Sequence, residues 1–135
     1  MKQNPIVPVR DVMKENFDVV DGMTTIANAL TQMKHKDTKM LLVKKGHDHD
    51  EYGMLLVSDI SREVLAKDRS PERVNVYEVM AKPVVTVDPD MDIRYCARLF
   101  DSLDLSRAPV VKDGEVVGVV SFTDLVLKGM LKNLA

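Results

Sequence analysis

The chain contains two copies of one sequence pattern, and this internal repeat limits what it can fold into more than any other feature. The repeat is visible in paired positions: Val12-Met13 and Val79-Met80, Val20-Asp21 and Val87-Asp88, Val43 and Val110, Gly53 and Gly118, and Asp59 and Asp124. The offset is 67 residues up to Val43 and 65 residues from Gly53 onward. The two additional residues of the first copy therefore lie between these positions, where a turn tolerates them better than a strand would.

The second copy shows its local structure most plainly. Residues 108–120 form two runs rich in β-branched side chains around Asp113-Gly114. This dipeptide favours a tight β-hairpin because both central turn positions require positive φ. Before the hairpin, Ile93, Ala97 and Phe100 recur at helical spacing and predict one face of a helix.

The first copy repeats this pattern, with Ile26, Leu30 and Met33 on the helix. Short apolar runs at 17–20 and 84–87 end in turn residues and predict a short strand at the start of each copy. Ser58-Asp59 and Thr123-Asp124 follow the hairpins and predict the N-caps of a second helix. Each copy is therefore expected to fold as β-α-β-β-α.

The domain organisation follows from the repeat. We expect repeat 1 at 9–66, a linker at 67–75 that opens on the charged, apolar-free run Lys67 to Arg73, and repeat 2 at 76–132. A unit of about 60 residues buries a marginal core by itself. The prediction is a mixed α/β (α+β) protein whose two repeats pack face to face with pseudo-twofold symmetry.

Charge and composition exclude several classes of function. Nineteen Lys and Arg stand against 21 Asp and Glu, so no excess positive charge is present to hold a nucleic acid. The longest apolar runs, such as 116–120, are far shorter than the roughly 20 residues of a membrane helix. We therefore expect a protein that binds neither nucleic acid nor membrane. A single cysteine, Cys96, and an N-terminus without an apolar segment predict a cytoplasmic location.

Three segments carry a family resemblance: Val85-Thr86-Val87-Asp88-Pro89, Arg107-Ala108-Pro109-Val110-Val111 and Gly118-Val119-Val120-Ser121-Phe122-Thr123-Asp124. Together with the order of elements in both copies, they resemble the cystathionine β-synthase (CBS) domain pair, or Bateman module. The resemblance implies a regulatory module without catalysis of its own or a required cofactor. It also implies an adenosine-containing ligand (AMP, ADP, ATP or S-adenosylmethionine) between the repeats, and a homodimer.

The resemblance places the better ligand site at the end of the second hairpin. Asp124 is expected to accept hydrogen bonds from the ribose hydroxyls at a helix N-terminus that faces the phosphate, with Gly118 in the same segment. Ser121 and Thr123 would add hydroxyl donors. The alternative is that Thr123 and Asp124 only cap the helix. Ser121 favours a ligand, because a hydroxyl inside a valine-rich strand is expected to gain nothing by capping.

The corresponding site of the first copy departs from the family pattern. It keeps Ser58 and Asp59, but Leu56 replaces the hydroxyl of Ser121. We therefore expect two unequal sites, with the Asp59 site weak or vacant.

In the family, the base slot that faces the Asp of one repeat is built from the other repeat. The implied slot residues are Val19, Thr38, Lys39 and Met40 for the Asp124 site, and Thr86, Leu105, Ser106 and Arg107 for the Asp59 site. Lys39 and Arg107 would lie near the phosphates, where positive charge suits an anion. The alternative is that each is a solvated surface charge.

Two further candidates carry less weight. His47 and His49 alternate in the first hairpin and could present two imidazoles to a metal ion. A closed site needs a third and a fourth ligand on rigid structure, so a polar turn that fills the insertion is the favoured interpretation. Cys96 lies between Ile93 and Phe100 and is predicted to be a small core residue, since no histidine lies nearby to activate it.

The sequence therefore favours a regulatory module that senses an adenine nucleotide, as an energy sensor would, and signals to an unidentified partner protein. The alternative is a dimerisation or docking module with degenerate sites, which Leu56 favours and Ser121 opposes. The residues do not distinguish the four adenosine compounds, because the ribose contact is common to all of them.

Overall fold

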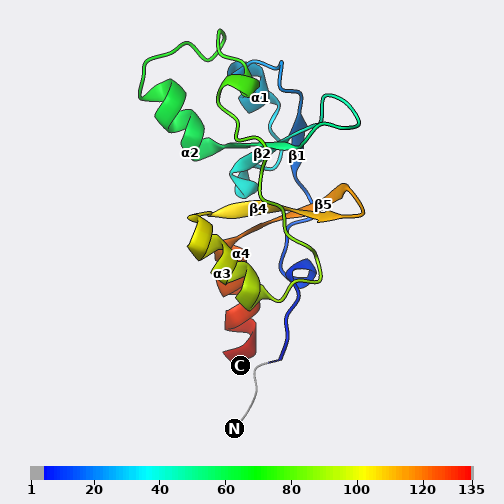
Figure 1. Cartoon of the computed structure of the whole chain (residues 1–135). Coiled ribbons are helices and arrows are strands. Elements are labelled where there is room, and N and C mark those ends of the chain that lie inside the picture. The colour runs from blue at the N-terminus through cyan, green and yellow to red at the C-terminus, as the bar shows by residue number, and fades with distance from the viewer. Residues whose placement is uncertain (1–4, 135) are drawn as a thin grey trace. The chain divides into compact units, whose positions relative to one another are not determined.

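The computed structural model describes residues 5–134, which form two compact units (Figure 1). Unit 2 runs from Asn16 to Val84, and unit 1 joins the N-terminal segment up to Glu15 to the chain from Val85 onward. The units therefore cut across the sequence repeats: the opening segment of each copy packs with the other copy. Within residues 5–134, no helix combines the length and apolar character needed to cross a bilayer.

Unit 2 contains a three-stranded sheet. Strand β1 (Asp18–Val20) pairs in parallel with β2 (Met40–Val43), which pairs antiparallel with β3 (Gly53–Leu56). The helices are α1 (Ile26–Gln32), α2 (Val57–Ile60), the π-helical continuation η3 (Ser61–Leu65), and the short 3-10 helices η2 (Lys36–Thr38) and η4 (Val76–Glu78). Its buried core includes Ile26, Leu41, Leu55 and Val76. Val74, in the expected linker, belongs to the same core.

Unit 1 contains a two-stranded antiparallel sheet of β4 (Arg107–Lys112) and β5 (Glu115–Ser121). Its helices are η1 (Val9–Asp11), α3 (Ile93–Leu103), α4 (Phe122–Asp124) and the continuations η5 (Leu125–Met130) and η6 (Leu131–Leu134). The core includes Val12, Ile93, Phe100 and Val120. The predicted order β-α-β-β-α is confirmed in unit 2, and in unit 1 it holds with one difference.

The difference is the strand predicted at 84–87, which is reduced to one parallel bridge between Val87 and Val110. The N–H of Val87 donates to the carbonyl of Pro109, and the N–H of Val111 donates to the carbonyl of Val87. The next bond of a parallel ladder would need an N–H at Pro109, which proline lacks. In β2 a leucine, Leu42, occupies the corresponding position, and β1 there extends to three residues.

The hairpin and the long helix of unit 1 follow the sequence patterns closely. Asp113 and Gly114 have φ values of 52° and 79°, so the turn has the conformation that this dipeptide predicts. The buried side of α3 carries Ile93, Cys96 and Phe100, so the prediction that Ala97 shares this face is wrong, and Ala97 is exposed. The core role predicted for Cys96 is confirmed, and burial raises the pKa of its thiol to about 11.

The predicted helix caps are wrong by two or three positions. The N-cap of α4 is Ser121, whose hydroxyl accepts a hydrogen bond from the backbone N–H of Asp124. The expectation that Ser121 gains nothing by capping is therefore wrong, because the strand ends at this residue and the helix begins at the next. In unit 2 the N-cap of α2 is Leu56, which has no hydroxyl to offer.

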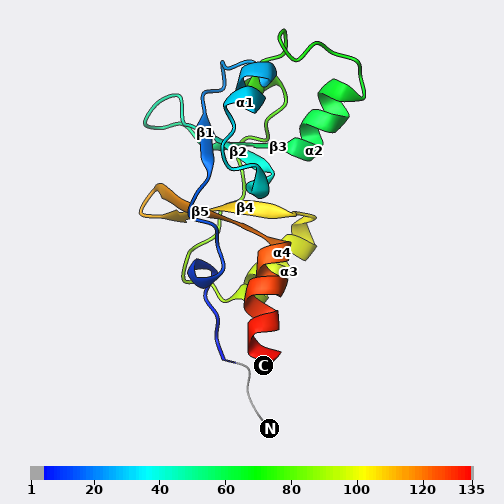
Figure 2. The same ribbon diagram turned by 180° about the vertical axis from the view of Figure 1, so that it is seen from behind.

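The N-terminal segment of unit 1 runs against β5, as both views show (Figures 1 and 2). Lys14 exchanges two backbone hydrogen bonds with Val119, at 2.8 Å and 2.9 Å. A Cβ atom at Gly118 would lie 2.6 Å from the Met13 sulfur and 2.9 Å from the Lys14 carbonyl oxygen. Glycine at this position is thus required by the close approach of another backbone.

We expect Gly118→Ala to destabilise the protein by about 1–3 kcal/mol, because the new methyl group would overlap a main-chain oxygen that cannot move alone. Urea unfolding followed by circular dichroism measures the change. Gly22→Ala is the control: its added Cβ would lie 3.6 Å or more from its neighbours, so its effect should stay within about 0.5 kcal/mol. Equal losses in the two variants would contradict the close-approach explanation.

Candidate functional site

The Asp124 side chain is buried at the start of α4, with 4% of its surface exposed. Its Oδ2 accepts hydrogen bonds from the Ser121 backbone N–H at 3.1 Å and from the Ser121 hydroxyl at 3.0 Å. The same hydroxyl accepts from the Asp124 N–H at 3.2 Å. This reciprocal capping box satisfies donors at the helix start and fixes the position of the carboxylate.

Two lysines approach the other carboxylate oxygen. Nζ of Lys14 lies 2.9 Å from Oδ1 of Asp124, and Nζ of Lys128 lies 3.4 Å from the same atom. Burial acts to raise the pKa of Asp124, but the hydrogen bonds from Lys14 and Ser121 together outweigh it, so the pKa lies below its usual value. The carboxylate is therefore charged at neutral pH although it is buried.

Arg107 interacts electrostatically with the same carboxylate. It pairs in register with Ser121 across the hairpin, and the neighbouring Ser106 carbonyl accepts from the Phe122 N–H at 3.0 Å. Desolvation lowers the pKa of Arg107, and the attraction to Asp124 opposes that effect. One buried carboxylate thus interacts with three cationic side chains, which gives this end of the hairpin a net positive charge.

The Asp59 carboxylate in unit 2 has different neighbours. Its side chain is 17% exposed and forms an ion pair with Arg62 of the same helical segment. The positions that correspond to Ser121, Lys14 and Lys128 are Leu56, Ala81 and Glu63. The structure thus adds two differences to the one that the sequence indicated. That the two sites bind ligand unequally stays a prediction.

The base-slot residues implied for the Asp124 site belong to unit 2. Val19 is about half exposed on β1, and Lys39 is exposed with a left-handed φ of 57°. Thr38 and Met40 are buried, and the Thr38 hydroxyl lies 2.8 Å from the His35 carbonyl oxygen. Val19 and Lys39 therefore present side chains to solvent, whereas Thr38 and Met40 stabilise unit 2 itself.

The residues implied for the Asp59 site are divided between the units. Ser58 is exposed on α2, and Thr86 is exposed just before Val87. Leu105, Ser106 and Arg107 belong to unit 1. Ser106 and Arg107 thus lie beside the residues of the Asp124 site.

The two remaining site residues of the second copy, Thr123 and Gly118, differ in burial. Thr123 is exposed on the first turn of α4, one residue before Asp124. Gly118 is buried in β5 against Met13 and Lys14, so a structural requirement accounts for it without a ligand.

Sequence reasoning missed Lys14 and Lys128. Lys128 could have been found, because it stands four residues after Asp124 on the same helix and i, i+4 pairs of opposite charge meet there. Lys14 is 110 residues from Asp124 in sequence. Only the pairing of the N-terminal segment with β5 brings the two together.

The histidines of the first hairpin lie in an ordered polar turn. Asp50 accepts hydrogen bonds from the Gly46 N–H at 2.8 Å and from Nζ of Lys82 at 2.7 Å, and Lys82 is the first cause of its lowered pKa. The His49 N–H donates to Nδ1 of His47 at 3.3 Å. Among the described residues, no three His, Cys, Asp or Glu side chains are grouped to hold a metal ion. The turn interpretation accounts for these contacts.

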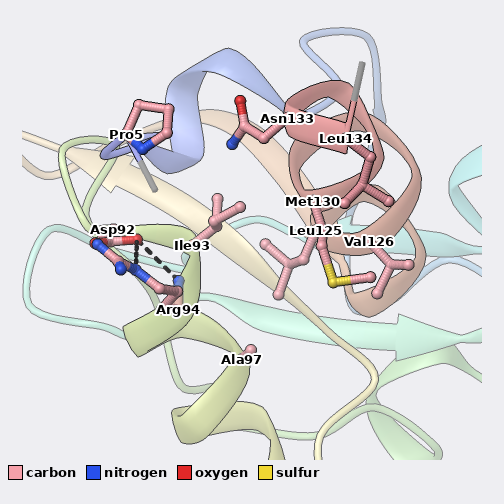
Figure 3. A pocket seen from close by; sticks show the side chains of 10 residues that line it. All are labelled: Pro5, Asp92, Ile93, Arg94, Ala97, Leu125, Val126, Met130, Asn133 and Leu134. Carbon is pink, nitrogen blue, oxygen red and sulfur yellow. Dashed lines mark hydrogen bonds and ion pairs between the residues drawn. The ribbon is translucent and has the colours of Figure 1, made fainter. Parts of the chain in front are cut away.

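A separate apolar pocket of about 190 Å³ lies in unit 1 between α3 and the C-terminal helical turns (Figure 3). Ile93, Ala97, Val126 and Met130 are among its lining residues. At its edge, Asp92 caps α3 and forms an ion pair with Arg94 at 2.8 Å. None of the residues implied for ligand binding lines this pocket.

Comparison with known proteins agrees with this architecture. The family model "CBS domain" matches the chain twice, at residues 9–66 and 76–129. The hexameric CBS-CP12 protein from bloom-forming cyanobacteria is 35% identical, with a TM-score of 0.87 over 92% of this chain and 72% of that chain. The CBS domain pair of protein MJ0100, solved with 5′-methylthioadenosine and S-adenosyl-L-methionine, is 23% identical with a TM-score of 0.77. It covers 95% of this chain and 99% of that chain, and the likeness is one of fold.

Protein MK0525 of Methanopyrus kandleri is 26% identical over 80% of this chain and 56% of its own length. Two further relatives that are 26% identical are covered over 64% and 62% of their lengths, so the chain spans less than two thirds of these proteins. Two matched segments cover most of the chain, and each corresponds to one of its β-α-β-β-α copies. The chain therefore belongs to the CBS domain family and consists of a pair of CBS repeats.

Proposed function

We propose that this CBS pair is a regulatory module that binds an adenosine-containing ligand between its repeats and passes the binding event to a partner protein. The candidate ligands are AMP, ADP, ATP and S-adenosylmethionine. The observation that supports the proposal is the charged, buried carboxylate of Asp124 among Lys14, Lys128 and Arg107. A carboxylate suits ribose hydroxyls, and cationic side chains suit phosphate oxygens.

The proposal gives each group of residues a role. Asp124 would accept hydrogen bonds from the ribose, and the exposed hydroxyl of Thr123 would donate to a phosphate oxygen. Ser121 would act as a positioning residue, because its hydroxyl and N–H hold the carboxylate. The exposed side chains of Val19 and Lys39 keep the roles that the family implies for them, in the base slot and near the phosphates.

The family gives the proposal independent support. CBS pairs are generally regulatory modules without catalysis of their own, and the MJ0100 pair of the same fold holds two adenosine compounds. The proposal therefore includes no catalytic step, no required cofactor and no nucleic-acid or membrane partner. It places the protein in the cytoplasm, where a single reduced thiol such as Cys96 is ordinary.

A second function, self-association, is favoured by exposed apolar side chains that recur in both repeats. Val57 and Leu65 in unit 2 correspond to Phe122 and Met130 in unit 1, and all four are at least 40% exposed. Val57 and Leu65 line one apolar groove, and Val126 and Met130 line another. Exposed apolar surface of this kind marks interaction sites. Because a 35% identical relative is hexameric, we propose that the occupant of these faces is a second copy of the chain. Ligand binding and self-association are compatible.

Titration calorimetry with AMP, ADP, ATP and S-adenosylmethionine tests the ligand proposal. We expect saturable binding near one ligand per chain for at least one of the four. Asp124→Asn should weaken it at least tenfold, because the amide keeps the shape but loses the charge and one acceptor oxygen. Asp59→Asn is the matched control and should change the affinity less than threefold. Absence of binding by all four compounds in folded, nucleotide-free protein would remove the ligand function, and the docking function would be the one that remains.

Light scattering after size-exclusion chromatography tests self-association. We expect a mass of twice the 15.2 kDa of one chain or a larger multiple. The double variant Val126→Lys and Met130→Lys should lower the mass to that of one chain, because it places two charges on the apolar face. Met23→Lys, an exposed apolar position in the loop before α1, should leave the mass unchanged. A monomeric wild-type protein at 100 µM or above would refute this function.

A further inference from the structure

Three hydrogen bonds and a second ion pair occupy most of the Asp124 carboxylate. Oδ1 receives Lys14 and Lys128, and Oδ2 receives the N–H and the hydroxyl of Ser121. A carboxylate offers about four lone-pair positions. Both hydroxyls of a ribose can therefore form hydrogen bonds with Asp124 only when one of the three hydrogen-bond donors leaves.

The donors differ in how easily they can leave. Ser121 is fixed, because its N–H belongs to the main chain and its hydroxyl caps α4. The Lys14 main chain is fixed by its two bonds to Val119, but its side chain is long, flexible and 23% exposed. Lys128 is 49% exposed and lies farther from the carboxylate. Lys14 is thus the close, mobile donor whose departure opens Oδ1.

Departure of Lys14 separates a charge pair that is partly buried. Such a step is unfavourable unless the ammonium group finds another anion. A nucleotide brings that anion in its phosphate, whereas adenosine brings none. Lys128 and Arg107 add to the positive field into which the phosphate would enter.

The other repeat shows that the lysine is not needed to build the fold. Ala81 corresponds to Lys14 and forms the same pair of backbone hydrogen bonds, here with Met54, at 2.9 Å each. Ala81 has no charge to offer to Asp59. The backbone crossing is therefore common to both repeats, and the ammonium group is an addition specific to the Asp124 site.

We infer that Lys14 determines ligand specificity at the Asp124 site by changing partner: its ammonium leaves the carboxylate for the phosphate of the ligand, and the ribose hydroxyls take its place. The site consequently takes phosphorylated nucleosides in strong preference to uncharged ones. This inference rests on the proposed function and adds to it a ligand class and the residue that selects it.

The test is the ratio of affinities for AMP and adenosine, measured by calorimetry on the full chain. In the wild-type protein AMP should bind at least 100-fold more tightly than adenosine. Lys14→Gln keeps a hydrogen-bond donor for Asp124 but removes the charge, and it should reduce this ratio at least tenfold. Lys14→Arg keeps the charge and should preserve the ratio within threefold.

Lys112→Gln is the control for net charge, because it removes a lysine five residues along β4 from Arg107, about 16 Å away at 3.3 Å per residue. It should leave the ratio unchanged, and circular dichroism confirms that each variant is folded. A ratio in Lys14→Gln equal to that of the wild type would overturn the role of Lys14 while leaving the proposed function intact. Absence of binding by AMP and adenosine in every variant would overturn this inference. The proposed ligand function itself would be removed only if none of AMP, ADP, ATP and S-adenosylmethionine binds.

Discussion

The end of the hairpin in unit 1 holds a buried negative charge that its neighbours must satisfy. An unpaired carboxylate at the burial of Asp124 would cost several kcal/mol, so the surrounding segments must supply donors. Ser121 supplies two hydrogen bonds from the end of β5, Lys14 supplies one from the N-terminal segment, and Lys128 adds an ion pair from the helix. The carboxylate therefore ties the N-terminal segment to the end of β5 and to the helix that follows it, 110 residues away in sequence.

Comparison of the two repeats separates the backbone framework from this charge network. In both units the opening segment of one copy lies against the last hairpin strand of the other copy, and a glycine permits the close approach, Gly118 in unit 1 and Gly53 in unit 2. Only unit 1 adds the hydroxyl and the two lysines. The framework thus follows from glycine and backbone hydrogen bonding, and the charges around Asp124 are not required for it.

The fold was more accessible from the sequence than the site. Periodicity and the Asp113-Gly114 turn depend on local interactions, so they predicted the order of elements and the hairpin. The prediction of a strand at 84–87 was wrong because Pro109, on the neighbouring strand, has no N–H for the next hydrogen bond of the parallel ladder. Ser121 was misjudged because strand and helix meet at that residue without an intervening turn, so one side chain both ends the strand and caps the helix.

Lys14 escaped prediction for a different reason. Nothing in its local sequence distinguishes it from a surface lysine, and its role exists only through pairing with β5. The repeat itself contained a usable signal, because Lys14 and Ala81 occupy corresponding positions next to the otherwise similar Val-Met pairs. Differences between copies of a repeat indicate where the copies have acquired different chemistry, once the structure shows which differences meet in space.

An internally satisfied carboxylate is compatible with a ligand site, and it changes what binding can do. The capping box already holds Oδ2 in place, so only the partner of Oδ1 has to change, and little reorganisation of the backbone accompanies it. A ligand that draws Lys14 away acts on the residue just before Glu15, where the chain passes from unit 1 into unit 2. A ligand shifts a conformational equilibrium only by contacts that differ between the states, so signalling to a partner would require the exchange at Lys14 to be more favourable in one state than in the other.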